Sequence, residues 1–236
     1  MKKHTFVLVH GGWHGGWCWK HVAGDLRRKG HTVFTPTLTG SGERAHLLGS
    51  NITLQTGIDD ILGVFEAEEL DSVTLVGHSA GAATIAGVAD RIPQRISSLI
   101  WLDGLILSDG ESLRTYFTPE QEAAYQAALE AGEVPFAPPP PQAFGVSPGT
   151  DADWMARRLT AQPFHTVTSV LHLGHPPGSG LPCTYVACIS PPHPFIAASH
   201  AVARAQKDWQ WLPLDACHDA MITAPLAVSK ILEKYA

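Results

Sequence analysis

Short apolar runs alternate with amphipathic stretches along most of the chain. The apolar runs are rich in β-branched residues, a composition typical of buried strands. Strands are predicted at residues 5–10, 31–36, 72–76, 96–102, 183–188 and 209–214. Helices are predicted at residues 17–29, 54–70, 80–90, 197–207 and 226–235.

The order of these elements predicts the fold class. In the second helix, apolar residues recur at positions i, i+3, i+4 and i+7, which gives the helix one apolar face: Ile58, Ile61, Leu62 and Phe65. Repeated strand–helix units favour a parallel sheet that is covered by helices on both faces. We therefore predict an α/β fold with a mostly parallel central sheet of about six strands.

The alternation stops between Gly104 and Leu181. Residues 120–131 and 151–159 look helical, but the proline-rich stretch "PFAPPPPQAFGVSPG" cannot be regular, because proline lacks a backbone donor. A flexible linker is one interpretation, but interspersed aromatic residues favour packing: Phe117, Phe136, Phe144, Trp154 and Phe164. We predict a single domain, 1–236, with a mainly helical cap inserted at about 105–180, over the carboxyl ends of the strands.

Composition and charge exclude several classes of function. Hydrophobic residues make up 44% of the chain, as in globular proteins, yet no apolar run approaches a membrane span. The net charge of −6, without a basic cluster, argues against nucleic-acid binding. The apolar run after Lys2 and Lys3 is too short for a signal peptide and has no cleavage site, so we expect a cytoplasmic protein.

The cysteines and histidines show no metal-binding spacing. The four cysteines are scattered and lack a C-x-x-C pair, so buried thiols are expected instead of disulfides. The thirteen histidines include no H-E-x-x-H and no pairing with cysteine at zinc spacing, so no metal is predicted. The sequence does not determine the oligomeric state, and it is compatible with a homodimer.

A candidate nucleophile lies in the pentad Gly77-His78-Ser79-Ala80-Gly81, which fits G-x-S-x-G. In that motif, a strand ends abruptly, a helix begins, and the serine hydroxyl is exposed on the sharp turn between them. A serine in an ordinary glycine-rich turn is the alternative. The predicted strand before Ser79 and the alanine-rich helix after it favour the nucleophile.

Two further segments complete the pattern at the carboxyl ends of the strands, where open α/β sheets bind ligands. His10-Gly11-Gly12-Trp13 follows the first strand, and its backbone N–H groups, with that of Ala80, could form an oxyanion hole. A nucleotide-binding loop does not fit, because "GGWHGGW" matches neither the dinucleotide-binding pattern G-x-G-x-x-G nor a P-loop. His218 lies between the last strand and the last helix, where this chain order places a general base.

With these motifs, the chain resembles the α/β-hydrolases of the plant methylesterase and hydroxynitrile lyase group and their bacterial esterase relatives. The resemblance lies in "FVLVHGGWHGGWCW", "TPTLTGSGERAHL", "LVGHSAG" and "CHDAM", which span residues 6–221. It implies Ser79 as nucleophile, His218 as base, and Gly12 and Ala80 as oxyanion donors. It also implies that no cofactor is needed.

Two positions depart from the lyases of this group. Those lyases carry a threonine after the first-strand histidine and a lysine after the catalytic histidine. Here these places hold Gly11 and Asp219. The lysine supplies positive charge for the cyanide leaving group, so an aspartate in its place argues against lyase chemistry.

The triad acid is missing from its usual place. Relatives carry an aspartate after the "TYVAC" strand, whereas residues 189–194 here are "ISPPHP". Neutralising a triad aspartate costs roughly 10⁴ in kcat, about 5 kcal/mol, so another carboxylate is expected. Asp103, at the end of the strand after the serine helix, is our prediction, because Asp215 and Asp219 lie too near His218 in sequence. Two alternatives stay open: Asp103 only braces its loop, or a diad operates with Ser190 or water holding His218.

These residues predict a serine hydrolase of small, hydrophobic or aromatic esters, acting through an acyl-enzyme intermediate. Trp13, Phe136 and Phe144 are predicted to line the substrate pocket. The expected partner is therefore a small-molecule ester. The alternatives are a cofactor-independent dioxygenase or lyase on the same fold, and a non-catalytic small-ligand binder with a degenerate triad.

Overall fold

Six strands form one parallel sheet at the centre of the protein, in the order β2-β1-β3-β4-β5-β6. The computed structural model describes residues 3–49, 51–130 and 136–236. The strands are β1 (Thr5–Val9), β2 (Thr32–Phe34), β3 (Val73–His78), β4 (Ile96–Leu102), β5 (Cys183–Cys188) and β6 (Trp209–Leu214). The parallel sheet confirms the predicted fold class, and β4, β5 and β6 have the predicted bounds.

The strand β3 runs two residues further than its sequence predicts. Every residue of β3 is buried. Pairing continues to its end, where Gly77 lies opposite Val9 of β1 and His78 lies opposite Leu102 of β4. Because its neighbours hold the strand to His78, the chain must turn at the next residue, Ser79.

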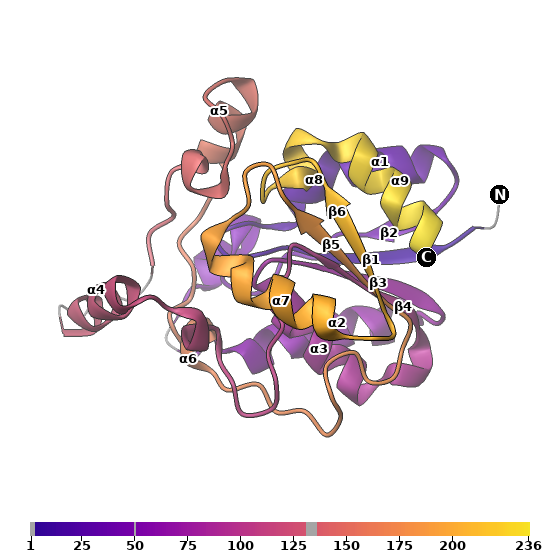
Figure 1. Ribbon diagram of the computed structural model, residues 1–236, viewed down its shortest axis with the longest axis horizontal. Coiled ribbons are helices and arrows are strands. Elements are labelled where there is room, and N and C mark those ends of the chain that lie inside the picture. Colours follow the sequence, from indigo (N-terminus) through magenta and orange to yellow (C-terminus); the bar gives the residue numbers. More distant parts are fainter. Residues whose placement is uncertain (1–2, 50, 131–135) are drawn as a thin grey trace.

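Helices cover both faces of the sheet (Figure 1). The helices around it are α1 (Lys20–Arg28), α2 (Leu54–Ala67), α3 (Gly81–Arg91), α7 (Ala197–Ala205), α8 (Ala220–Thr223) and α9 (Pro225–Tyr235). Alternate strand residues serve the two faces: Val7 and Val9 pack with α2 and α3, while Phe6 and Leu8 pack with α1 and α9. The apolar face predicted for α2 packs inward, with Ile61 and Phe65 fully buried.

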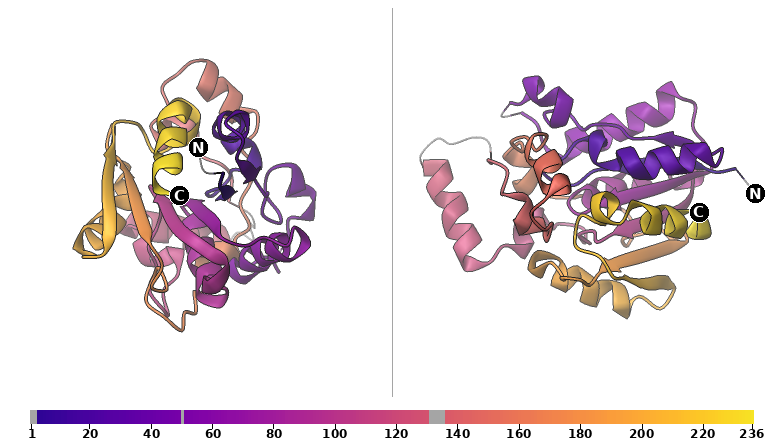
Figure 2. Two further views of the ribbon diagram at one scale, coloured as in Figure 1. Left: turned by 90° about the vertical axis from the view of Figure 1, so that its right-hand side faces the viewer. Right: turned by 90° about the horizontal axis from the view of Figure 1, so that it is seen from above.

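The segment between β4 and β5 carries α4 (Pro119–Glu130), α5 (Thr150–Ala156) and α6 (His165–Thr168). These helices lie beyond the carboxyl ends of the strands, opposite the two termini (Figures 1 and 2). The sequence predicted α4 and a longer α5 but not the single turn of α6, and Ala131 lies outside the described residues. Phe164 stacks on Tyr125 and Phe136, with ring centroids 4.4 and 4.8 Å away, so aromatic packing holds this segment together.

All four cysteines are buried free thiols, as the sequence predicted. No helix within the described residues is long and apolar enough to cross a membrane. Cytoplasmic location and oligomeric state stay predictions.

Candidate active site

Ser79 occupies the sharp turn between β3 and α3. Its φ is +51°, a left-handed conformation that is strained for any residue with a side chain. The Ser79 N–H donates to the Leu102 carbonyl of β4 at 3.3 Å, and its own carbonyl accepts from the Leu105 N–H at 3.0 Å. Only glycine fits at Gly81, because a Cβ there would lie 2.3 Å from the His10 carbonyl oxygen. The chain therefore forms the strained strand-to-helix turn that G-x-S-x-G predicts.

The loop after β1 packs directly against Ser79. A Cβ at Gly11 would lie 2.8 Å from the Ser79 Cβ and 2.9 Å from Nδ1 of His78. A threonine, which the hydroxynitrile lyases of the similar group carry here, would not fit in this arrangement. The structure thus adds a steric argument against lyase chemistry to the argument from charge.

His10 sets the direction of one backbone N–H in this loop. Its Nε2 lies 3.0 Å from the Leu38 N–H and must accept from it, so Nδ1 carries the proton and donates to the Gly11 carbonyl at 2.8 Å. Burial lowers the pKa of His10 to about 4, which keeps the ring neutral near pH 7. A trans peptide points its N–H away from its carbonyl, so His10 also orients the N–H of Gly12.

A buried ion pair connects the same loop to the segment that carries His218. His14 lies 2.7 Å from the Gly12 carbonyl through Nδ1 and 3.0 Å from Oδ2 of Asp219 through Nε2. Burial opposes a charge on either group, but their mutual attraction outweighs it, so the pKa of His14 is raised and the pKa of Asp219 is lowered. A doubly protonated His14 then donates to both neighbours.

His218 is buried, and its Nδ1 lies 2.7 Å from Oδ2 of Asp103. Asp103 directly follows β4, has a φ of +45° and is fully buried. Burial opposes its ionisation, but hydrogen bonds from His200 and His218 outweigh that effect and hold the pKa of Asp103 far below its usual value. An ionised Asp103 fixes the proton of His218 on Nδ1, which leaves Nε2 free to act as a base.

The alternative holders of His218 lie elsewhere. Asp219 is hydrogen-bonded to His14, as described above. Asp215 is exposed at the surface. Ser190 is also exposed, and its backbone N–H donates to the Ala216 carbonyl at 3.0 Å.

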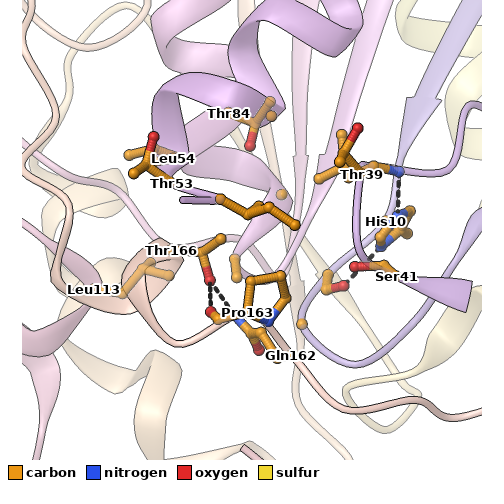
Figure 3. A pocket seen from close by; sticks show the side chains of 17 residues that line it. His10, Thr39, Ser41, Thr53, Leu54, Thr84, Leu113, Gln162, Pro163 and Thr166 are labelled. Atoms are coloured by element: carbon orange, nitrogen blue, oxygen red, sulfur yellow. Dashed lines mark hydrogen bonds between the residues drawn. The ribbon is translucent and has the colours of Figure 1, made fainter. Parts of the chain in front are cut away.

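A small cavity of about 50 Å³ opens beside the glycine loop (Figure 3). Gly12 and Ala80, the two expected oxyanion donors, line it. The His10 imidazole and several hydroxyl and carboxamide groups supply its polar lining, the latter from Thr39, Ser41, Thr53, Thr84, Gln162 and Thr166. Of the residues that the structure describes, no lysine, arginine, aspartate or glutamate lines this cavity.

The residues predicted to line the substrate pocket, Trp13, Phe136 and Phe144, are not among those that line this cavity. Phe144 is buried between Trp13 and His14, with ring centroids 5.9 and 5.3 Å away, and its ring centroid is 6.4 Å from that of His218. Phe136 stacks on Phe164 in the segment between β4 and β5. Their contact with substrate stays a prediction.

Sequence reasoning missed Gln162, whose Oε1 lies 2.4 Å from the position that a Gly12 Cβ would take. It also missed the roles of His14 and His200. These residues follow no local motif, so only tertiary contacts could identify them.

One group of described residues has the spacing of metal ligands. Donor atoms of His78, His218 and Asp219 lie within 4.8 Å of one another. Hydrogen bonds already use Nδ1 of His218 and Oδ2 of Asp219, and His78 Nε2 lies 3.0 Å from the His218 carbonyl. These contacts join the three residues in one buried polar network, in which Nδ1 of His78 and Oδ1 of Asp219 have no hydrogen-bond partner among the described residues.

Comparison with known proteins decides the family. Residues 6–230 match the alpha/beta hydrolase family. The chain belongs to this family. It is similar to the carbendazim hydrolyzing esterase of Nocardioides sp. (strain SG-4G), with 39% identity over 242 residues that cover 98% of each protein. This match confirms the resemblance to esterases that the motifs indicated.

Plant enzymes and solved structures agree with this assignment. Putative methylesterase 14, chloroplastic, of Arabidopsis thaliana is 34% identical over 127 residues, which are 53% of this chain and 36% of that protein. An extracellular alpha/beta-hydrolase from Paenibacillus species shares the fold with a TM-score of 0.83 and 23% identity over 99% of both chains. The methylesterase MES16 from Arabidopsis shares it with a TM-score of 0.74 and 22% identity over 98% of both chains. The two structures support the fold, and the esterase from Nocardioides sp. supports ester hydrolysis as the broad activity.

The buried pair of His14 and Asp219 leads to a prediction about stability and pH. The raised pKa of His14 stabilises the fold below about pH 6.5, and this contribution is lost as the pH rises through the folded-state value. The lowered pKa of Asp219 stabilises the fold above about pH 3.8, and this contribution is lost as the pH falls. The pair should therefore contribute most near pH 5.5.

We expect Asp219→Asn to lower the free energy of unfolding by about 3–5 kcal/mol at pH 5.5, because it leaves a buried charge without its partner. At pH 9 the loss should be clearly smaller, since His14 can be neutral. Urea unfolding at both pH values measures the difference. Asp208→Asn, at an exposed position, is the control and should have little effect at either pH. An equal loss for Asp219→Asn at both values would contradict the ion pair.

Proposed function

We propose that this protein is a serine hydrolase that cleaves small, uncharged esters through an acyl-enzyme intermediate. Ser79 Oγ attacks the ester carbonyl carbon while Nε2 of His218 takes its proton. The backbone N–H groups of Gly12 and Ala80 stabilise the negative charge that forms on the carbonyl oxygen. Ser79 and His218 act together, so neither is expected to be effective alone.

The second half of the reaction reverses these roles. His218 gives its proton to the leaving alcohol, and the acyl group stays on Ser79. Water then attacks the acyl carbonyl while His218 accepts a proton from it. The bond between the acyl carbon and Ser79 Oγ breaks, His218 returns the proton to Oγ, and the acid product is released. This sequence needs no group beyond the side chains and backbone already described.

The hydrogen bond of 2.7 Å between Asp103 and His218 is the observation that carries this proposal. The loop after β5, residues 189–194, has no carboxylate. If no other carboxylate contacted His218, a serine–histidine diad or a non-catalytic binder would be the better interpretation. A buried, ionised aspartate on Nδ1 stabilises the imidazolium that forms when His218 takes the serine proton. We therefore assign Asp103 as the third member of the triad.

A covalent probe tests the nucleophile directly. A fluorophosphonate should label the protein rapidly, and mass spectrometry of the digested protein should place the label on Ser79. Ser79→Ala and His218→Ala should both abolish fast labelling, because the probe reacts only with an activated serine. A dioxygenase that uses only the histidine–aspartate pair, or a binder without catalysis, would show slow or no labelling in the unaltered protein.

The lining of the cavity indicates the class of substrate. Its polar side chains are hydroxyls, a carboxamide and the His10 imidazole, and a pKa of about 4 keeps His10 neutral, so the lining is neutral near pH 7. Such groups can hydrogen-bond an uncharged substrate but cannot pair with an ionised one. Because a similar esterase is named for hydrolysing carbendazim, that compound is a natural first substrate to test.

A matched pair of esters tests this selectivity. We expect p-nitrophenyl hemisuccinate to be hydrolysed with a kcat/KM about 100-fold lower than p-nitrophenyl butyrate, a difference of about 2.7 kcal/mol. The two acyl groups are similar in length but differ in the terminal carboxylate. Spontaneous hydrolysis of each ester supplies the correction for intrinsic reactivity. Equal corrected values would show that the acyl group does not enter a neutral cavity.

A further inference from the structure

A second histidine occupies the other oxygen of Asp103. His200 Nε2 lies 2.7 Å from Oδ1, on the side of the carboxylate away from His218. His200 belongs to α7, the helix that follows β5. Because an ionised carboxylate only accepts hydrogen bonds, Nε2 of His200 must be the donor.

Two aromatic rings hold His200 in this orientation. Its ring meets those of Tyr185 and Trp211 edge to face, with centroids 5.6 and 5.4 Å away. The side chain is only 14% exposed. Both aromatic residues lie on strands, β5 and β6, so the imidazole is packed against the rigid part of the fold.

Asp103 thus accepts three hydrogen bonds. Oδ1 takes two of them, from His200 and from the Cys188 backbone N–H at 3.0 Å, while Oδ2 takes the one from His218. The two bonds on Oδ1 restrict rotation of the carboxylate. That leaves Oδ2 directed at the base.

We propose that His200 is a positioning residue for the hydrolysis, which holds Asp103 so that its second oxygen faces His218. The inference rests on the proposed function, because it gives His218 the role of the base.

The chemistry requires such a partner for two reasons. When His218 takes the proton of Ser79, Asp103 must stay on Nδ1 to stabilise the imidazolium, and a carboxylate that rotates would lose that geometry. A truncated His200 would also open the edge of the site to water, which competes for the carboxylate oxygens. Both effects act on the transition state and leave the substrate cavity unchanged.

Three variants test the proposal with p-nitrophenyl butyrate as substrate. His200→Phe keeps an aromatic ring but removes the donor, and we expect kcat to fall about 10- to 100-fold, by analogy with the loss when a hydrogen-bond partner that orients a metal ligand is removed. KM should change by less than about twofold, because the cavity is untouched. His200→Gln can return an N–H to Oδ1 and should recover most of the lost kcat.

His175→Phe is the matched control. His175 Nδ1 lies 2.9 Å from Oδ1 of Asp90, the same kind of contact at an exposed position away from His218. This variant should keep both kcat and KM. If His200→Phe also keeps kcat, or if His200→Gln loses as much as His200→Phe, the positioning role is refuted.

Proton NMR gives a readout that does not depend on turnover. The Nδ1–H of His218, hydrogen-bonded to a buried carboxylate, should give a downfield resonance in the unaltered protein and in His200→Gln. That resonance should shift upfield or broaden in His200→Phe. An unchanged resonance in folded His200→Phe would overturn the inference. This test is independent of Ser79→Ala, which tests the proposed function and not the position of Asp103. If His200→Phe does not fold, His200→Leu, which also lacks the donor to Oδ1, takes its place: a lower kcat and a shifted resonance support the role, and unchanged values refute it.

Discussion

Ser79→Ala is expected to abolish the hydrolysis of p-nitrophenyl esters while the protein stays folded. Removing the serine or the histidine of a triad typically lowers kcat by about 10⁶, because nucleophile and base act as a unit. The alanine side chain fits the space that the serine leaves, and the left-handed backbone at this turn is equally strained with either residue. Initial rates and thermal unfolding of purified variants measure the two effects.

Ser72→Ala is the matched control for this variant. Ser72 precedes β3 just as Ser79 follows it, and its φ of +52° is almost the same, but it lies exposed at the opposite end of the strand. It should keep full activity. His218→Ala should be as damaging as Ser79→Ala, and the double variant no worse than either. Activity within about tenfold of the unaltered protein, a loss of only ~1.4 kcal/mol, would exclude the serine mechanism.

The parts of the site that were predictable from the sequence are those with a local cause. The turn at Ser79 follows from a strand, two glycines and a helix that are adjacent in the chain. The position of Asp103 followed from where a parallel strand ends, since all the strands point their carboxyl ends toward the same edge. Strand ends and turns are properties of short segments, so one sequence suffices to locate them.

The contacts that surround the site depend on residues far apart in the chain. His14 and Asp219 are 205 positions apart, and His200 and Asp103 are 97 apart. No periodicity or spacing connects such pairs, and thirteen histidines gave no means of choosing among them. The sequence therefore indicated the groups that we propose as reactive but not the groups that contact them.

The segment between β4 and β5 was harder for a different reason. Within residues 136–149, the described part of its proline-rich stretch, the structure has an isolated bridge at Phe136 and a short 3-10 turn at Pro141–Phe144, and α6 is a single turn, so neither segment has a period long enough to detect. Aromatic residues predicted packing there, and Phe164 supplies it. Which of these rings faces a substrate could not follow from composition.

The acid of the triad leads to the prediction that best separates the alternatives. Asp103→Asn should lower kcat by about 10⁴ with little change in KM, because it removes the charge that stabilises the His218 imidazolium and leaves the cavity intact. Asparagine keeps the shape of aspartate, so the fold should persist. Steady-state kinetics near pH 7.5, with circular dichroism as the check on folding, provide the measurement.

Ser190→Asp distinguishes this triad from a diad that lost its acid. If His218 lacked a carboxylate, an aspartate restored to the loop after β5 should raise the activity. In this structure, Nδ1 of His218 is already bonded to Asp103, and Ser190 lies exposed with its backbone tied to Ala216. We therefore expect Ser190→Asp to leave kcat unchanged in the otherwise unaltered protein. A rise in kcat for Ser190→Asp, together with a nearly silent Asp103→Asn, would mean that Asp103 only braces its loop and that His218 works without a buried acid.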